Sequence, residues 1–300
     1  MVYTEIKEIN GRKYYYRVKS IRNKDKISKQ RVYLGVDLEK NKIKEFEQKA
    51  DEKLVALNYL LDKEEIKKLA KIKQDYKKEP KETFENRYEA FCSLFTYDST
   101  AIEGNTISLQ ETASLLFENR APSAKSLREI NEILNHKKAF DYILSYKGEI
   151  TKELILKLHE LVVKDTLKPH LANQTGIYRT LQVYIKGTNW MPPKPEEVPA
   201  EISNLLNWYS RNKKSLHPLI LASYFHVAFE TIHPFVDGNG RTGRLLMNFI
   251  LHKNGFPMIN IPNSKKTKYY DCLQEAQIEG NLEPMLKFLF ALLQEQNLRF

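Results

Sequence analysis

From residue 83 onward, most apolar positions recur at spacings of three and four residues, the periodicity of helices packed on a core. Runs of this kind span residues 126–146 and 151–163. The clearest stripe consists of Phe84, Tyr88, Phe91, Phe95 and Ile102. This pattern predicts a mainly α-helical protein.

The N-terminal part of the chain follows a different pattern. Residues 13–21 and 30–36 are rich in tyrosine and β-branched residues, which favours strands. The polar stretch 22–29 between them predicts a longer connecting loop. A helical pattern then runs from about residue 44 to 78. We therefore predict a small β-hairpin followed by a helical region.

Pro80 breaks this helical pattern, so we place a domain boundary there, between residues 1–80 and residues 81–300. Within the second part, residues 176–193 depart from the helical periodicity. A glycine and two prolines punctuate this segment, which predicts a second β-hairpin. Its strand-forming residues are Val183, Tyr184 and Ile185.

Composition supports a folded domain and adds a basic charge. Hydrophobic residues make up 42% of the 300 residues, enough for a sizeable core, and the formal net charge is +10. Lysines are spread along the chain with glutamates nearby, as on solvated helix faces. Basic residues alternate with tyrosines in the N-terminal hairpin, a pattern also compatible with single-stranded nucleic acid. We favour a small amphipathic sheet that covers one end of the helical domain.

The sequence contains no feature that predicts a membrane or secreted protein. No apolar run approaches the roughly 18 residues that span a bilayer, and the N-terminus resembles no secretory signal. The two cysteines, Cys92 and Cys272, form no metal-binding motif. We therefore expect reduced thiols and a cytoplasmic protein.

The segment HPFVDGNGRTGR, residues 233–244, contains the most specific combination of functional groups. Pro234 disfavours helix at the residue before it, while Gly238 and Gly240 permit positive φ. A helical pattern resumes at Arg241. A loop that leads into a helix N-terminus is a natural anion site, because backbone N–H groups converge there.

The side chains of this segment suit nucleotide chemistry. Arg241 and Arg244 lie three residues apart on the first turn, so their guanidinium groups share a face and can bind a polyphosphate. Asp237 can hold Mg²⁺ that bridges the phosphates. His233 is placed to take a proton from an incoming hydroxyl group. A simple turn requires none of these four residues.

This segment resembles the Fic-domain signature, His-x-Phe-x-Asp/Glu-Gly-Asn-Gly-Arg-x-x-Arg, at every fixed position. The resemblance implies a Fic-type helical bundle that transfers the AMP moiety of Mg·ATP to a Ser, Thr or Tyr hydroxyl of a protein, including itself. His233 would be the general base, Phe235 would anchor the loop, and Asp237 would coordinate Mg²⁺. The phosphates would be bound by Gly238, Asn239, Gly240, Arg241 and Arg244.

A second motif, residues 99–105, resembles the inhibitory helix motif of the same family, Ser/Thr-x-x-x-Glu-Gly/Asn. There the glutamate pairs with the last arginine of the signature, so the resemblance implies a Glu103–Arg244 ion pair and autoinhibition, with Ser99 in the same motif. Thr100 and Glu103 also match a capping box. We favour a helix that runs into the motif and stops at Gly104.

Two further segments match the family in part. Residues 176–193 resemble the flap, a β-hairpin that pairs with an extended segment of the target, so Val183, Tyr184 and Ile185 would bind it. Tyr270 would line the adenine pocket. The family often has an arginine shortly before this position, where this chain has Ser264-Lys265-Lys266-Thr267. Contacts assigned to that arginine therefore do not carry over.

Together these observations predict an autoinhibited protein AMP-transferase with ATP as substrate and Mg²⁺ as cofactor. The target protein is not identified, and proteins of this class are often homodimers. Removal of AMP, with Glu103 orienting a water, and transfer of another nucleotide or of phosphate stay open as related activities. A different class also stays open, a nucleic-acid-binding or scaffold protein that uses the basic N-terminal hairpin.

Overall fold

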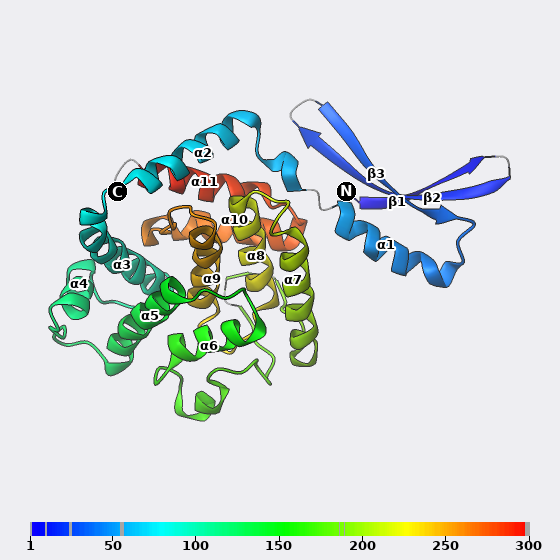
Figure 1. The fold of residues 1–300 in the computed structure, drawn as a ribbon. Helices are drawn as coiled ribbons and strands as arrows, with labels where there is room; N and C mark the ends of the chain where they lie inside the picture. Colours follow the sequence, from blue (N-terminus) through cyan, green and yellow to red (C-terminus); the bar gives the residue numbers. More distant parts are fainter. Residues whose placement is uncertain are drawn as a thin grey trace. The chain divides into compact units, whose positions relative to one another are not determined.

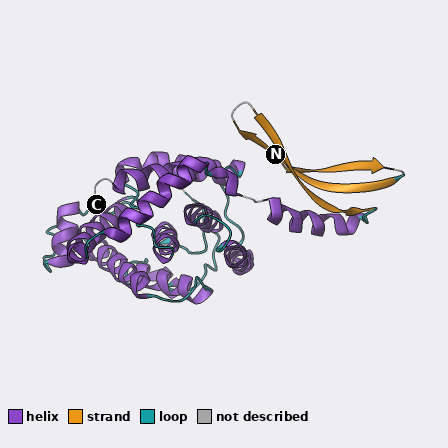
Figure 2. Ribbon diagram, turned by 45° about the horizontal axis from the view of Figure 1, so that its top comes forward, coloured by secondary structure: helices purple, strands orange, loops and turns teal. Residues whose placement is uncertain are grey.

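The computed structural model describes residues 2–9, 11–23, 26–54, 57–185, 187–188 and 190–297. The chain divides into two compact units, Met1–Tyr59 and Leu60–Phe300. Strands are described in the first unit, and helices dominate the second (Figure 2). The predicted mainly α-helical fold is confirmed.

The first unit is a three-stranded antiparallel sheet followed by a helix. The strands β1 (Val2–Ile9), β2 (Arg12–Asn23) and β3 (Lys26–Val36) pair in the order β1-β2-β3. The helix α1 (Lys40–Leu54) packs on this sheet. Its small core consists of Tyr15 and Leu34, with Leu38, Ile43 and Phe46 packed against them.

Two details of the predicted N-terminal hairpin are wrong. The stretch 22–29 was expected to be a loop, but Arg22 pairs with Ile27 and Asn23 with Lys26, so the strands continue almost to the turn. The strand β1 was not predicted, although its segment is rich in β-branched and aromatic residues. Main-chain pairing extends the ladder through a stretch that is mostly polar.

The second unit is a helical bundle built around a buried helix, α9 (Asn239–Lys253). Helix α9 packs against α3 (Phe84–Ala101), α5 (Leu127–Ser145), α6 (Lys152–Val163) and α8 (Pro218–Ile232) (Figure 1). Short 3-10 turns cover Leu57–Leu60, Lys81–Thr83, Pro169–Gln174, Pro195–Glu197 and Asn263–Lys265. The other helices of this unit are α2 (Lys63–Lys78), α4 (Leu109–Phe117), α7 (Val198–Asn212), α10 (Lys266–Glu279) and α11 (Glu283–Asn297).

The division between the units lies before α2, whereas the sequence places a boundary at Pro80. Leu69 and Ile72 of α2 are buried in the helical unit. Lys287 of α11 forms an ion pair with Glu65 at 2.6 Å. The helical pattern predicted from residue 44 to 78 corresponds to two helices, α1 and α2. A capping box at Asp62 begins α2.

The helix α3 runs into the motif at residues 99–105. The hydroxyl group of Thr100 donates to the Thr96 carbonyl, one turn back, so Thr100 lies inside the helix and does not cap a new one. The helix ends at Ala101, and Gly104 adopts a φ of 102°. The next helix, α4, begins with a capping box of Ser108 and Glu111.

The segment 176–193 does not form the expected hairpin in its described residues, none of which is assigned to a strand. The buried Arg179 side chain donates to the carbonyl oxygens of Leu181 and Pro193. A side chain therefore joins the two arms of this segment where a main-chain ladder was expected. Among the described residues, no helix is both long and apolar enough to cross a membrane.

Candidate active site

The loop between α8 and α9 brings the residues of the signature together. α8 ends at Ile232, and His233 caps it in the left-handed conformation, with a φ of 49°. Gly238, with a φ of 79°, precedes the first residue of α9. A Cβ atom on Gly238 would lie 2.5 Å from Val163 Cγ1, so glycine is needed for the packing as well as the turn.

Helix α9 begins at Asn239, two residues earlier than the pattern predicts, so Gly240 lies inside the helix. Gly240 is not among the residues with positive φ, contrary to expectation. Its lack of a side chain serves a different purpose, because a Cβ atom there would lie 2.2 Å from Glu103 Oε1. The glycine leaves space for a carboxylate directly above the first turn of α9.

Asn239 and Phe235 fix the shape of the loop. The Asn239 side chain accepts from Phe235 N at 2.9 Å and donates to Phe235 O at 2.8 Å. Phe235 is fully buried and stacks on His159, whose Nε2 lies 3.1 Å from the Asp237 carbonyl. The Asn239 side chain thus holds the loop, and only its backbone N–H faces the anion site expected at a helix N-terminus.

His233 is half-buried at the end of α8. Burial disfavours the charged imidazolium and lowers the pKa of His233 to about 4. The imidazole is therefore neutral at neutral pH and has a lone pair available for a proton. Arg179 Nε donates to the His233 carbonyl at 2.9 Å, which fixes the backbone that carries the ring.

Glu230 is a neighbour of His233 that the sequence analysis did not identify. Its carboxylate Oε2 lies 3.9 Å from His233 Nδ1, and the residue is 6% exposed. Burial raises the pKa of Glu230 to about 8, although the positive charge of Arg244 opposes this shift. An acidic residue within the otherwise apolar α8 is the signal that points to it.

The two arginines of the signature are buried and occupied by carboxylates. Arg244 donates to Glu103 Oε1 at 2.8 Å and to the Ser99 carbonyl at 2.8 Å. Its Nε donates to Ser99 Oγ at 3.0 Å. The expected Glu103–Arg244 ion pair is therefore present. Arg241 donates to Asp237 Oδ1 at 3.0 Å, while its Nε and Nη1 have no hydrogen-bond partner in the described structure.

Asp237 is the residue to which the sequence assigns Mg²⁺. Its side chain is 38% exposed, and Oδ2 lies 3.5 Å from Arg128 Nη2. Among the described residues, no group of three or more His, Cys, Asp or Glu side chains could hold a metal ion. A single carboxylate fits Mg²⁺ because this ion usually takes one or two protein ligands and completes its shell with phosphate oxygens and water.

The remaining predicted residues lie at the margin of the site. Tyr184 is 76% exposed, and no described contact joins residues 183–185 to His233. The segment is held by Trp190, whose Nε1 donates to the Thr231 carbonyl at 2.9 Å. Tyr270 is 40% exposed. Burial raises its pKa to about 12, with a further increase from the negative charge of Glu103, so this tyrosine lies within electrostatic range of the ion pair.

Comparison with known proteins shows similarity to one family. Residues 149–251 match the sequence model of the Fic/DOC family. The chain is 41% identical over 197 residues to a protein named protein adenylyltransferase Fic from Drosophila persimilis. It is equally similar, 41% over 197 residues, to the protein of that name from Drosophila virilis. The match covers 64% of this chain and 37% of the D. persimilis protein, so the chain spans under two fifths of that relative.

Solved structures share the fold. A Fic-domain-containing signalling protein from Bacteroides thetaiotaomicron superposes with a TM-score of 0.70 at 28% identity, covering 78% of this chain and 95% of that one. Fic-1 from C. elegans superposes with a TM-score of 0.70 at 26% identity, covering 88% of this chain and 77% of that one. These matches extend well beyond the residues of the family model.

Proposed function

We propose, from the match of residues 149–251 to the Fic/DOC family model, that this protein transfers the AMP moiety of ATP to a hydroxyl group of a target protein. The observation that carries the proposal is a half-buried His233 beside a helix N-terminus that also bears two buried arginines. A base and a phosphate site in one loop are the two requirements of nucleotidyl transfer.

In the proposed reaction, His233 takes the proton of the target hydroxyl group while the hydroxyl oxygen forms a bond to the α-phosphorus of ATP. The bond from that phosphorus to the bridging oxygen breaks, and pyrophosphate leaves. Backbone N–H groups at the start of α9 and the guanidinium of Arg241 stabilise the phosphate charge. Asp237 would hold Mg²⁺, which would supply further charge neutralisation when bound.

We further propose that the structure represents a restrained state. The guanidinium group of Arg244 donates to Glu103 and Ser99. A terminal phosphate of ATP would have to displace these acceptors before it could bind Arg244. A γ-phosphate bound at Arg244 would also meet the negative charge of Glu103. Productive ATP binding therefore requires Glu103 to move or to be removed.

The base is tested by His233→Ala in the Glu103→Gly background, assayed with ATP labelled at the α-phosphate and compared with Glu103→Gly alone. Loss of the general base is expected to reduce transfer by at least about 100-fold. Binding of ATP should change little, since the phosphate-binding groups lie on α9. His170→Ala, at an exposed histidine outside the signature loop, is the matched control and should label as its background does. Undiminished labelling by His233→Ala would contradict the assignment.

Removal of AMP from a modified protein is a second candidate. Arg244 bonds Oε1 of Glu103, and the glutamate side chain is 33% exposed, so its carboxylate can also hold a water near the loop. Incubation with a target that already carries AMP separates the two activities. Release of AMP that depends on Glu103 would favour removal, whereas a stable modified target would favour transfer.

A further inference from the structure

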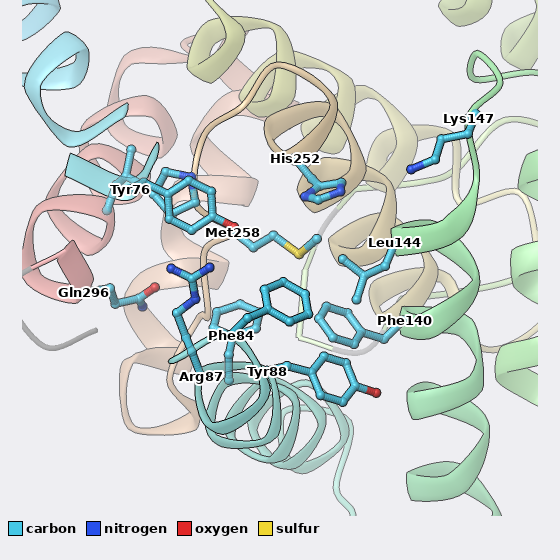
Figure 3. A pocket seen from close by; sticks show the side chains of 13 residues that line it. Tyr76, Phe84, Arg87, Tyr88, Phe140, Leu144, Lys147, His252, Met258 and Gln296 are labelled. Atoms are coloured by element: carbon cyan, nitrogen blue, oxygen red, sulfur yellow. The ribbon is translucent and has the colours of Figure 1, made fainter. Parts of the chain in front are cut away.

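The helical unit contains a cavity of about 300 Å³ that the proposed reaction does not use. Five aromatic rings line it, and His252 and Lys147 border it on one side (Figure 3). None of its described lining residues is acidic. The rings belong to Tyr76, Phe84, Tyr88, Phe91 and Phe140.

This cavity lies at the opposite ends of the helices that build the candidate active site. Phe84 begins α3, whereas Glu103 follows its last residue. His252 occupies the last turn of α9, whereas Arg241 lies in its first turn. A helix of 15 residues, such as α9, is roughly 22 Å long. A molecule in this cavity therefore does not contact the nucleotide site.

The walls of the cavity suit a flat apolar body. Tyr88 and Phe140 lie nearly parallel, with ring centroids 6.1 Å apart, and Phe91 packs against Phe140 at 6.0 Å. Phe84 is 58% exposed at the cavity, so a ligand would cover apolar surface that water now contacts. Cavities of about 300 Å³ are at the lower end of small-molecule sites, which limits the body to about three rings.

The charges of the lining select an anion. Arg87 is paired with Glu79 and stacks over the Tyr76 ring at 4.7 Å, so its charge is already compensated. Lys147 is exposed, and its amine points toward His252 (Figure 3). Burial, and after it the charge of Lys147, lower the pKa of His252, so Lys147 lies close enough to add positive charge on this side. An acidic group here would complement it.

We propose that this cavity binds a small organic anion with a flat aromatic body, which lies against Phe84, Tyr88 and Phe140 while its acidic group faces Lys147. The acid lies at the edge of the cavity and stays partly hydrated, because Lys147 is exposed. The aromatic walls therefore supply most of the affinity, and Lys147 supplies the selection for negative charge.

The full-length chain is tested with 1-anilinonaphthalene-8-sulfonate, whose fluorescence rises in apolar sites. The neutral compound N-phenyl-1-naphthylamine has the same ring system without the sulfonate. We expect the anion to bind at one site per chain, several-fold more tightly than the neutral compound, with affinity that falls as salt increases. Saturating ATP should leave binding unchanged. Equal affinity for the two compounds, or displacement by ATP, would overturn the proposal.

Two variants locate the site. Leu144→Trp fills the cavity and is expected to abolish binding, while Lys147→Glu reverses the charge and should remove the preference for the anion. Lys168→Glu, a charge reversal at an exposed lysine on another part of the surface, is the matched control and should bind as the parent does. Lys147 is exposed, so its variant should fold even if Leu144→Trp does not. Unchanged binding in Lys147→Glu would rule out the proposed orientation.

Discussion

Burial acts on two neighbouring titratable side chains in opposite ways. His233 loses its charge because the imidazolium is poorly solvated, and Glu230 retains its proton because the carboxylate is poorly solvated. At neutral pH the pair is therefore uncharged, with His233 ready to accept a proton. The shifted pKa of each residue has a measurable consequence.

The first consequence concerns the pH dependence of transfer. Because the pKa of His233 is about 4, we expect the base to stay neutral down to about pH 5. Initial rates of auto-labelling, measured in a variant freed from Glu103, should not fall as pH is lowered from about 8 to about 6. A loss of activity centred near pH 6.5, the ordinary pKa of histidine, would contradict this expectation.

The second consequence concerns stability. The pKa of Glu230 rises from 4.5 to about 8 on folding, so the native state binds the extra proton in this range. Stability from this group is fully present below pH 4.5 and is lost as pH rises through about 8. Urea unfolding should show that Glu230→Gln weakens this loss relative to the parent. Identical pH dependence in both proteins would contradict the assignment.

At the scale of elements, Arg179 connects two segments that are distant in sequence. Its buried guanidinium donates to carbonyl groups of the segment 176–193 and of His233. We expect Arg179→Ala to lower the free energy of unfolding by about 2 kcal/mol, since it leaves three partly buried carbonyl groups without their donor. Thermal unfolding measures this. Arg120→Ala, at an exposed arginine, should change stability little.

The helices and the signature loop could be predicted because each has a local cause. Apolar spacing marks α3 and α9, a capping box marks α4, and Pro234 with Gly238 marks the turn. The ion pair of Glu103 with Arg244 required the family resemblance, because 141 residues separate the partners. The form of the segment 176–193 depends on Arg179 and Trp190, whose buried partners are not evident from local sequence.

At the scale of the whole molecule, each unit has its own core, and the basic N-terminal unit is the part that could bind nucleic acid. The net charge of +10 is distributed over the chain with acidic residues nearby, so we expect no strongly salt-dependent binding. Titration of single-stranded RNA with the full chain and with a variant lacking residues 1–45 should give equally weak binding. Tight binding lost on this deletion would support the nucleic-acid alternative.

The homodimer stays a prediction, which light scattering can check.

The account depends most on Glu103 as the restraint on an AMP-transferring site. The most direct measurement is the intact mass of Glu103→Gly after incubation with Mg·ATP, beside the parent and the double variant Glu103→Gly/His233→Ala. We predict that only Glu103→Gly gains the mass of one or more AMP groups to a substantial extent. Labelling no greater than that of the parent would contradict the restraint, and an added mass other than AMP would contradict the proposed reaction.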